Sequence, residues 1–268
     1  GSIKQWDTLP VISVNNFSMY YGLSSIHSHD STFLKRYKEY IEMVDTSFNH
    51  LGRRGQVIDI SDHALNSPLF PFLNIKYILS KTRIYHENSF SYIGEVQEEG
   101  VKIYRNEKWV PRFFMSNKYK SYNNKEEFIR IVKEEGDNLK EIVPFEGLKP
   151  KESESKKEFK LKYDIGVVEY KNDSVTVKIN TNDSGFLVFL DNYYPGWKAY
   201  IDDQQAHIYR VFWTFKGVYI PDEGEHTVVF KYEPTFLRLG IIISIFTIVL
   251  TLIIYKLGLA RSCSLRHL

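Results

Sequence analysis

The chain has 268 residues, and its 35 basic and 33 acidic side chains leave it almost without net charge. This balance, with no clustered basic face, argues against nucleic-acid binding, and a single cysteine excludes a disulfide framework. Aromatic residues make up 15% of the sequence. Such a content is typical of β-rich packing, or alternatively of a surface that faces sugars or lipid headgroups. The length predicts one or two domains.

Residues 1–149 are predicted to form an α+β domain. Apolar residues recur at helical spacing over residues 32–48, with Ser31 as a candidate N-cap, and a second amphipathic helix is expected at residues 125–135. A tight helical turn is expected at residues 68–74. Strands are predicted at residues 75–80, 91–96, 101–106 and 109–115, with the middle two as a hairpin and the last at a sheet edge because of Pro111.

A charged segment at residues 150–160 is the best candidate for a linker. It precedes a predicted β-sandwich-like domain at residues 161–235, where short strands alternate with turns rich in Asn, Asp and Gly. Pro234 cannot donate a ladder hydrogen bond, so it marks the exit from the sheet. The expected strands lie at residues 166–170, 174–180, 185–191, 198–202, 206–211, 215–220 and 226–232.

Residues 239–255, LGIIISIFTIVLTLIIY, form an uncharged apolar run between Arg238 and Lys256. About seventeen residues at a rise of about 1.5 Å give roughly 25 Å of helix. The hydrocarbon core of a bilayer needs about 30 Å, and snorkelling by the flanking cations can close that gap. We therefore expect a transmembrane helix at residues 236–259, followed by a tail at residues 260–268.

The orientation follows from the charge of the tail, which is basic. The positive-inside rule predicts a cytoplasmic tail and an extracytoplasmic body at residues 1–237 of a bacterial membrane protein. The N-terminus shows no export signal, so we expect upstream transmembrane helices of a longer protein to export this body. Ser244, Thr247 and Thr251 share one helix face that could pack on those helices, although a lipid-facing helix tolerates the same residues.

Several segments in chain order form a pattern that is more specific than any one of them alone. They are NNFSMYYGLSSIH at residues 15–27, LNIKYIL at residues 73–79, Asn106 with Pro111 and Arg112, LVFLDNYYPGWKAYID at residues 187–202, and PDEGEHTVVFKYEP at residues 221–234. These segments resemble the bacterial YfhO family, and the last two resemble its C-terminal end.

The resemblance implies a multi-pass protein of the cell envelope, similar to the GT-C glycosyltransferases. Such enzymes use a polyprenyl-phosphate sugar donor, and their catalytic carboxylate usually lies in an outer loop that this chain lacks. We therefore assign no catalytic residue and expect the chain to support sugar transfer without catalysing it alone. The alternative is a single-pass surface module that binds a glycan or a protein partner. A self-contained hydrolase using Asp191 and Asp202 is a third, weaker hypothesis.

The turn at residues 193–197 contains the best candidates for a binding surface in the second part. Tyr193 and Tyr194 are expected to be half exposed and could stack on a glycan or a prenyl headgroup. Pro195 and Gly196 suit a tight turn, and Trp197 is expected to enter the sandwich core. The nearby acidic residues Asp191, Asp202 and Asp203 are predicted to serve turns rather than acid–base chemistry.

Two loops of the first part contain further weak candidates. One is an aromatic loop that we expect near the membrane helices, where it could line an acceptor site. The other is a basic loop that could meet a phosphate, although a solvated loop is the simpler interpretation. His27 and His29 could bind zinc with a third ligand, but no partner group is evident, so we predict neither a metal nor a cofactor. The candidate residues are Tyr20, Tyr21, His27, His29 and Asp30 in the first loop, and Arg53 and Arg54 in the second.

Overall fold

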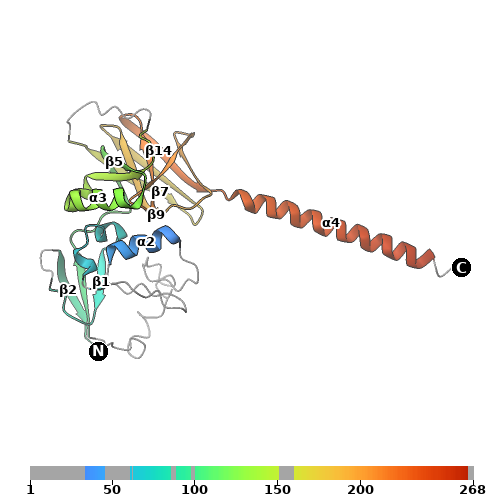
Figure 1. The fold of residues 1–268 in the computed structure, drawn as a ribbon, viewed down its shortest axis with the longest axis horizontal. Coiled ribbons are helices and arrows are strands. Elements are labelled where there is room, and N and C mark those ends of the chain that lie inside the picture. Colours follow the sequence, from blue (N-terminus) through green and yellow to red (C-terminus); the bar gives the residue numbers. More distant parts are fainter. Residues whose placement is uncertain are drawn as a thin grey trace.

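The computed structural model describes residues 34–45, 61, 63–85, 89–97, 100–150 and 160–264. Within these ranges the chain is mostly β-structure, arranged in three sheets, with few helices apart from a long one at the C-terminal end (Figure 1). The predicted fold class is therefore confirmed: a first part with helices and strands, a β-sandwich, and one apolar C-terminal helix.

The first layer of the sandwich is a five-stranded sheet with the order β11-β10-β14-β8-β7. Val175, Val177 and Ile179 alternate along β8 and are buried, because successive residues of a strand point to opposite faces. The strands are β7 (Tyr163–Tyr170), β8 (Ser174–Thr181), β10 (Trp197–Ile201), β11 (Gln204–Ala206) and β14 (Gly224–Tyr232).

The second layer is a six-stranded sheet with the order β4-β9-β13-β12-β6-β5. Its central strands are buried on both faces, which explains their nearly continuous apolar sequences. β4 begins just after Pro111 and lies at the sheet edge, as predicted. The strands are β4 (Phe113–Ser116), β5 (Lys118–Tyr122), β6 (Ile142–Glu146), β9 (Gly185–Asn192), β12 (Ile208–Val211) and β13 (Phe215–Ile220).

Three strands of this second sheet precede the predicted linker. β5 and β6 pair in parallel, and they are joined by α3 (Lys125–Glu135) and the 3-10 turn η3 (Gly136–Lys140). Neither strand was predicted, because their short sequences show no clear alternation. The sandwich therefore extends beyond the segment 161–235 that we predicted for it, since sheet pairing joins residues on both sides of the linker.

The helix α3 is fixed at both ends as the sequence predicted. The Asn124 side chain accepts a hydrogen bond from the Glu127 amide at 2.9 Å, and the Glu127 carboxylate accepts one from the Asn123 amide at 2.8 Å. Gly136 follows with φ 51° and ends the helix.

The rest of the first part consists of a small sheet and short helices. The three-stranded sheet has the order β1-β3-β2, and its β2–β3 hairpin was predicted. The helix α2 begins after Leu34, so the described helix is shorter than residues 32–48, and the predicted N-cap Ser31 lies outside the described residues. The elements are α2 (Lys35–Val44), η1 (Ala64–Asn66), η2 (Phe70–Leu73), β1 (Tyr77–Ser80), β2 (Phe90–Val96) and β3 (Val101–Asn106).

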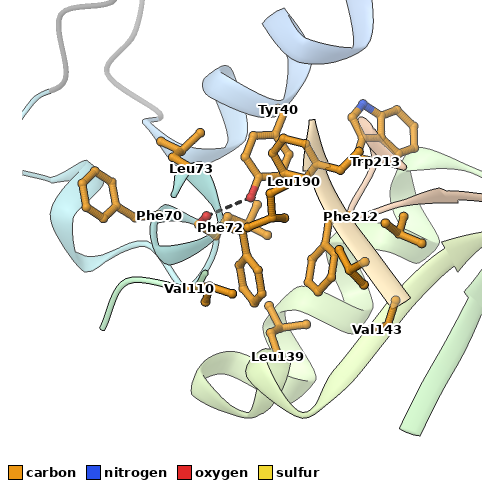
Figure 2. Packing of buried hydrophobic residues seen from close by; sticks show 14 of the residues in the cluster. Tyr40, Phe70, Phe72, Leu73, Val110, Leu139, Val143, Leu190, Phe212 and Trp213 are labelled. Carbon is orange, nitrogen blue, oxygen red and sulfur yellow. Dashed lines mark hydrogen bonds between the residues drawn. The ribbon is translucent and has the colours of Figure 1, made fainter. Parts of the chain in front are cut away.

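A single apolar cluster joins the first part to the sandwich (Figure 2). The Phe72 ring of η2 stacks on Phe212 from the β12–β13 turn, with 4.2 Å between ring centroids. Tyr40 of α2 is fully buried, and its hydroxyl donates a hydrogen bond to the Leu69 carbonyl at 2.8 Å. A second cluster fills the space between the two sheets, where Phe189 packs on Phe230.

The helix α4 (Thr235–Ser264) leaves the sandwich directly after β14 and extends away from the body (Figure 1). Its segment Leu239–Lys256 is long and apolar enough to cross a membrane, and none of that segment is buried inside the protein. A helix that is apolar on all sides and covered by no protein needs a lipid environment or partner helices.

Candidate functional site

The predicted candidates of the first part cannot be placed, because all of them lie outside the described residues. They are Tyr20, Tyr21, His27, His29, Asp30, Arg53 and Arg54. The turn at residues 193–197 is described, and it lies where β14 passes into α4. Among the residues that the structure describes, no group of three or more His, Cys, Asp or Glu side chains could hold a metal ion.

The backbone of this turn is attached to the strand that leads into α4. Trp197 pairs with Tyr232 in the β10–β14 register, and the Glu233 amide donates a hydrogen bond to the Gly196 carbonyl at 2.7 Å. Gly196 has φ 107°, and a Cβ there would lie 2.9 Å from the Tyr232 ring. The turn therefore requires glycine for two reasons, its left-handed backbone and its close approach to Tyr232.

The aromatic side chains of the turn form a cluster at the root of α4. The ring centroid of Tyr232 lies 6.3 Å from that of Tyr194 and 5.6 Å from that of Trp197. Tyr194 is 46% exposed, and Tyr193 is partly buried. Trp197 packs only partly buried against the edge of the core, so it does not enter the core as fully as predicted. Its ring instead covers a buried cation.

That cation is Lys216 of β13, whose side chain is fully buried. Its Nζ lies 2.7 Å from Oδ2 of Asp191, 3.5 Å from the Trp197 ring centroid and 4.6 Å from that of Phe189. Burial lowers the pKa of Lys216 to about 8, and the attraction of Asp191 only partly offsets this effect. No sequence pattern pointed to this lysine, since it stands among ordinary strand residues.

A second cation, Arg112, lies beside this pair. Its guanidinium carbon is 5.1 Å from the ring centroid of Tyr170 and 6.0 Å from that of Phe189. Arg112 also contributes to lowering the pKa of Lys216. The cluster thus contains two cations and one carboxylate, with aromatic rings on several sides.

Comparison with known families assigns the segment that contains this turn. Residues 151–244 match the family described as "Bacterial membrane protein YfhO". This part of the chain is similar to the YfhO family. The match confirms the resemblance noted for residues 187–202 and 221–234, and it runs from the linker through every strand from β7 to β14 and into α4. No curated protein and no solved structure matches the chain significantly.

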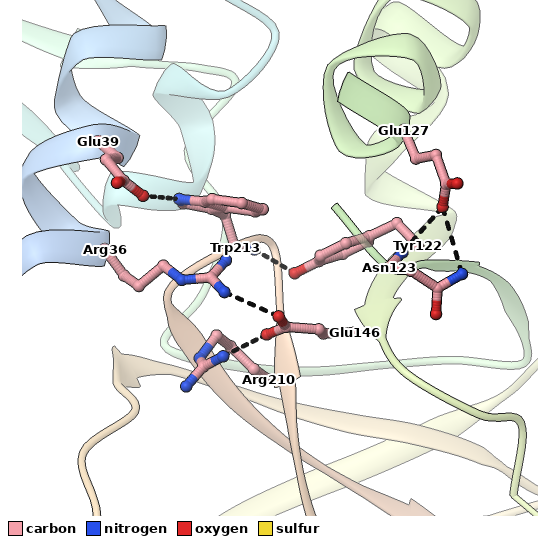
Figure 3. Close-up of polar contacts among 8 residues, drawn as sticks. All are labelled: Arg36, Glu39, Tyr122, Asn123, Glu127, Glu146, Arg210 and Trp213. Atoms are coloured by element: carbon pink, nitrogen blue, oxygen red, sulfur yellow. Dashed lines mark hydrogen bonds and ion pairs between the residues drawn. The ribbon is translucent and has the colours of Figure 1, made fainter. Parts of the chain in front are cut away.

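The segment that matches this family meets the first part of the chain at a polar joint (Figure 3). Glu146 of β6 accepts a hydrogen bond from Arg36 of α2 at 2.8 Å and also pairs with Arg210 of β12. The Arg36 guanidinium lies 3.8 Å over the Trp213 ring, and the Trp213 indole donates to Glu39 at 2.9 Å. These contacts connect α2 to the strands β6 and β12 and to the β12–β13 turn.

The joint also contains unusual backbone geometry in the β12–β13 turn. Phe212 and Trp213 have φ values of 45° and 72°, which bulky residues seldom adopt. Both are buried, and the Trp213 amide donates to the Tyr122 hydroxyl at 3.0 Å. Strain of this kind persists only where surrounding contacts hold it, so the joint is a firmly packed region.

The acidic residues Asp202 and Asp203 serve a turn, as predicted. Both have positive φ, at 49° and 64°. Asp202 accepts hydrogen bonds from the Thr227 amide at 2.8 Å and contacts His226 Nδ1 at 2.7 Å. These bonds hold the pKa of Asp202 below its usual value. Asp191 belongs to β9 and pairs with Lys216, whereas Asp202 follows β10 and contacts His226 and Thr227, so the two carboxylates have separate partners and do not form one acid–base pair.

Proposed function

We propose that this chain is the extracytoplasmic C-terminal portion of a multi-pass, YfhO-like envelope protein. In this role it supports the transfer of sugar from a polyprenyl-phosphate donor to an envelope acceptor, and it does not catalyse the transfer alone. The helix α4 crosses the membrane and packs on helices of the same protein. The body, residues 1–237, stands outside and shapes the acceptor or donor site.

One observation supports this proposal most directly: the aromatic turn is attached to the root of α4. Thr235 begins the helix three residues after Tyr232, and Leu239 begins the apolar segment. Four residues of helix at a rise of about 1.5 Å span only about 6 Å. If α4 crosses a bilayer, Tyr194 and Tyr232 therefore lie near the headgroups, where Tyr and Trp rings are enriched.

The chemistry of the turn suits a sugar or a lipid headgroup. The exposed ring of Tyr194 offers an apolar face to a sugar and a hydroxyl to its polar edge. Lys198 and Lys231 hold Glu233 at 2.8 Å and 2.9 Å, and these bonds lower the pKa of Glu233 to about 2. Glu233 is thus ionised and paired with two lysines, so it is no candidate for a general acid.

The decisive experiment replaces Tyr194 by Ser in the complete protein encoded around this chain. Membranes carrying this variant should incorporate less labelled sugar from a polyprenyl-phosphate donor into envelope polymer. Tyr85→Ser is the matched control, because Tyr85 is 78% exposed in the first part of the chain. Sugar transfer by this chain alone would contradict the proposal, as would unchanged transfer in membranes that lack the whole protein.

The orientation can be tested separately. In a Cys263→Ser background, a cysteine introduced at Asp203 stands on the β10–β11 turn, away from α4. A membrane-impermeant maleimide should label it in intact cells. Labelling only after permeabilisation would place the body in the cytoplasm and exclude a donor site outside.

The surface-binding alternative makes a different prediction for Tyr194→Ser. Normal sugar transfer together with lost glycan binding in this variant would favour that alternative.

A further inference from the structure

Arg112 stands out because its charge has no carboxylate partner among the described residues. Asp191, beside it, is already engaged in an ion pair of 2.7 Å with Lys216. Arg112 instead packs over the rings of Tyr170 and Phe189. A guanidinium held by aromatic rings keeps its five N–H donors available for an anion.

An uncovered apolar surface borders this guanidinium along β7. Tyr163, Val167 and Tyr170 pair with buried residues of β8, so they belong to the inward face of the sheet. Even so, their side chains are 42%, 51% and 49% exposed. The facing edge strand β4 has only four residues and leaves them uncovered.

The position of this surface relative to α4 suggests what covers it. Tyr170 pairs with Val175, and Val175 pairs with Phe230, which lies five residues before the start of α4. The Tyr232 amide donates a hydrogen bond at 2.7 Å to the carbonyl of Asp173, in the turn that follows Tyr170. The Arg112 end of β7 therefore lies on the same side of the sandwich as the root of α4.

We propose that Arg112 binds the phosphate of an anionic phospholipid, while the ring of Tyr170 beside it packs against the glycerol region of the same lipid. Two cations against one carboxylate leave the cluster with one uncompensated positive charge among the described residues. Guanidinium groups bind phosphate through two parallel hydrogen bonds. The proposal depends on α4 being a membrane helix, but it does not depend on sugar transfer.

The test uses the full chain, purified in a neutral detergent and mixed with either phosphatidylglycerol or phosphatidylcholine. Native mass spectrometry should show phosphatidylglycerol retained about tenfold better, as expected for a charge-assisted pair. Arg112→Gln should abolish this preference, and Arg112→Lys should keep part of it. Arg130→Gln is the matched control, because Arg130 lies on α3 with a 69% exposed side chain.

Several outcomes would overturn the proposal. One is equal retention of the two lipids by the unaltered chain, and another is an unchanged preference in Arg112→Gln. Displacement of phosphatidylglycerol by an equal concentration of inorganic phosphate would show a free-phosphate site instead of a lipid site. If Arg112→Gln does not fold, Tyr170→Ser decides, since Tyr170 is 49% exposed and its loss should reduce the retention of phosphatidylglycerol; unchanged retention would contradict the proposal.

Discussion

Two tryptophans of this chain each carry a cation over the ring, and each cation pairs with a carboxylate. At the joint, Arg36 lies 3.8 Å from the Trp213 ring and pairs with Glu146. At the root of α4, Lys216 lies 3.5 Å from the Trp197 ring and pairs with Asp191. The two arrangements share their chemistry but differ in what they connect.

The joint brings together elements that are distant in sequence. Trp213 is 5% exposed and receives contacts from α2, while Glu146 comes from β6. The arrangement around Trp197 stays within the sandwich and leaves Tyr194 in solvent. The difference indicates that the joint stabilises the fold, whereas the root of α4 combines a fixed backbone with an accessible surface that can bind a ligand.

The largest effect is expected at the joint, for Trp213→Ala. The change removes a buried ring that contacts α2, Tyr122 and Phe128, so the free energy of unfolding should fall by about 3–5 kcal/mol. Thermal unfolding followed by circular dichroism in detergent measures it. Trp109→Ala, at a partly exposed site, should lower the free energy of unfolding much less. Equal losses in the two variants would show that Trp213 stabilises the fold no more than a partly exposed tryptophan does.

The buried ion pair at the root of α4 should respond asymmetrically. Asp191→Asn leaves the Lys216 charge buried without its carboxylate, which should cost about 3 kcal/mol of unfolding free energy. Lys216→Met leaves Asp191, whose side chain is 34% exposed, in contact with water and should cost less. Denaturant unfolding of both single variants and the double variant measures this. If Lys216→Met lowers the free energy of unfolding more than Asp191→Asn does, the buried Lys216 charge is not the member of the pair that needs its partner.

A smaller effect is expected for Gly196→Ala. The new Cβ would lie 2.9 Å from the Tyr232 ring at a residue with φ 107°, and such strain should cost about 2 kcal/mol. Gly94→Ala is the control, because nothing lies within 4 Å of its added Cβ. Similar melting temperatures for the two variants would show that the turn is not tightly held against β14.

A further effect is a pH dependence that Lys216 should cause. Its pKa is lowered from 10.5 to about 8 in the folded chain, so the unfolded chain binds more protons between these values. Stability should therefore rise as pH increases from 8 towards 10. The rise should be weaker in Lys216→Met. A curve that is unchanged by the substitution would assign the effect to other groups and leave Lys216 as an ordinary charged lysine.

The sequence predicted the local elements well where a short pattern decides them. The caps of α3, the β2–β3 hairpin and the strands β7 to β10 and β12 to β14 follow from side-chain periodicity and turn residues, whereas the short strand β11 was not predicted. It missed β5 and β6, whose parallel pairing depends on a crossover helix. It also missed Lys216 and Arg36, because a cation that stacks on a distant ring leaves no local pattern.

By itself, the sequence determined that this protein has a β-rich body, a glycine-dependent turn at residue 196 and one apolar C-terminal helix, and it indicated the YfhO family. These properties depend on composition and on neighbours within a few residues. Only the tertiary structure decided that strands before the linker complete the sandwich, that Lys216 lies under Trp197, and that Arg112 stands beside an uncovered apolar strand. Each of these depends on pairing between distant segments, which sheet register and core packing fix and local sequence does not encode.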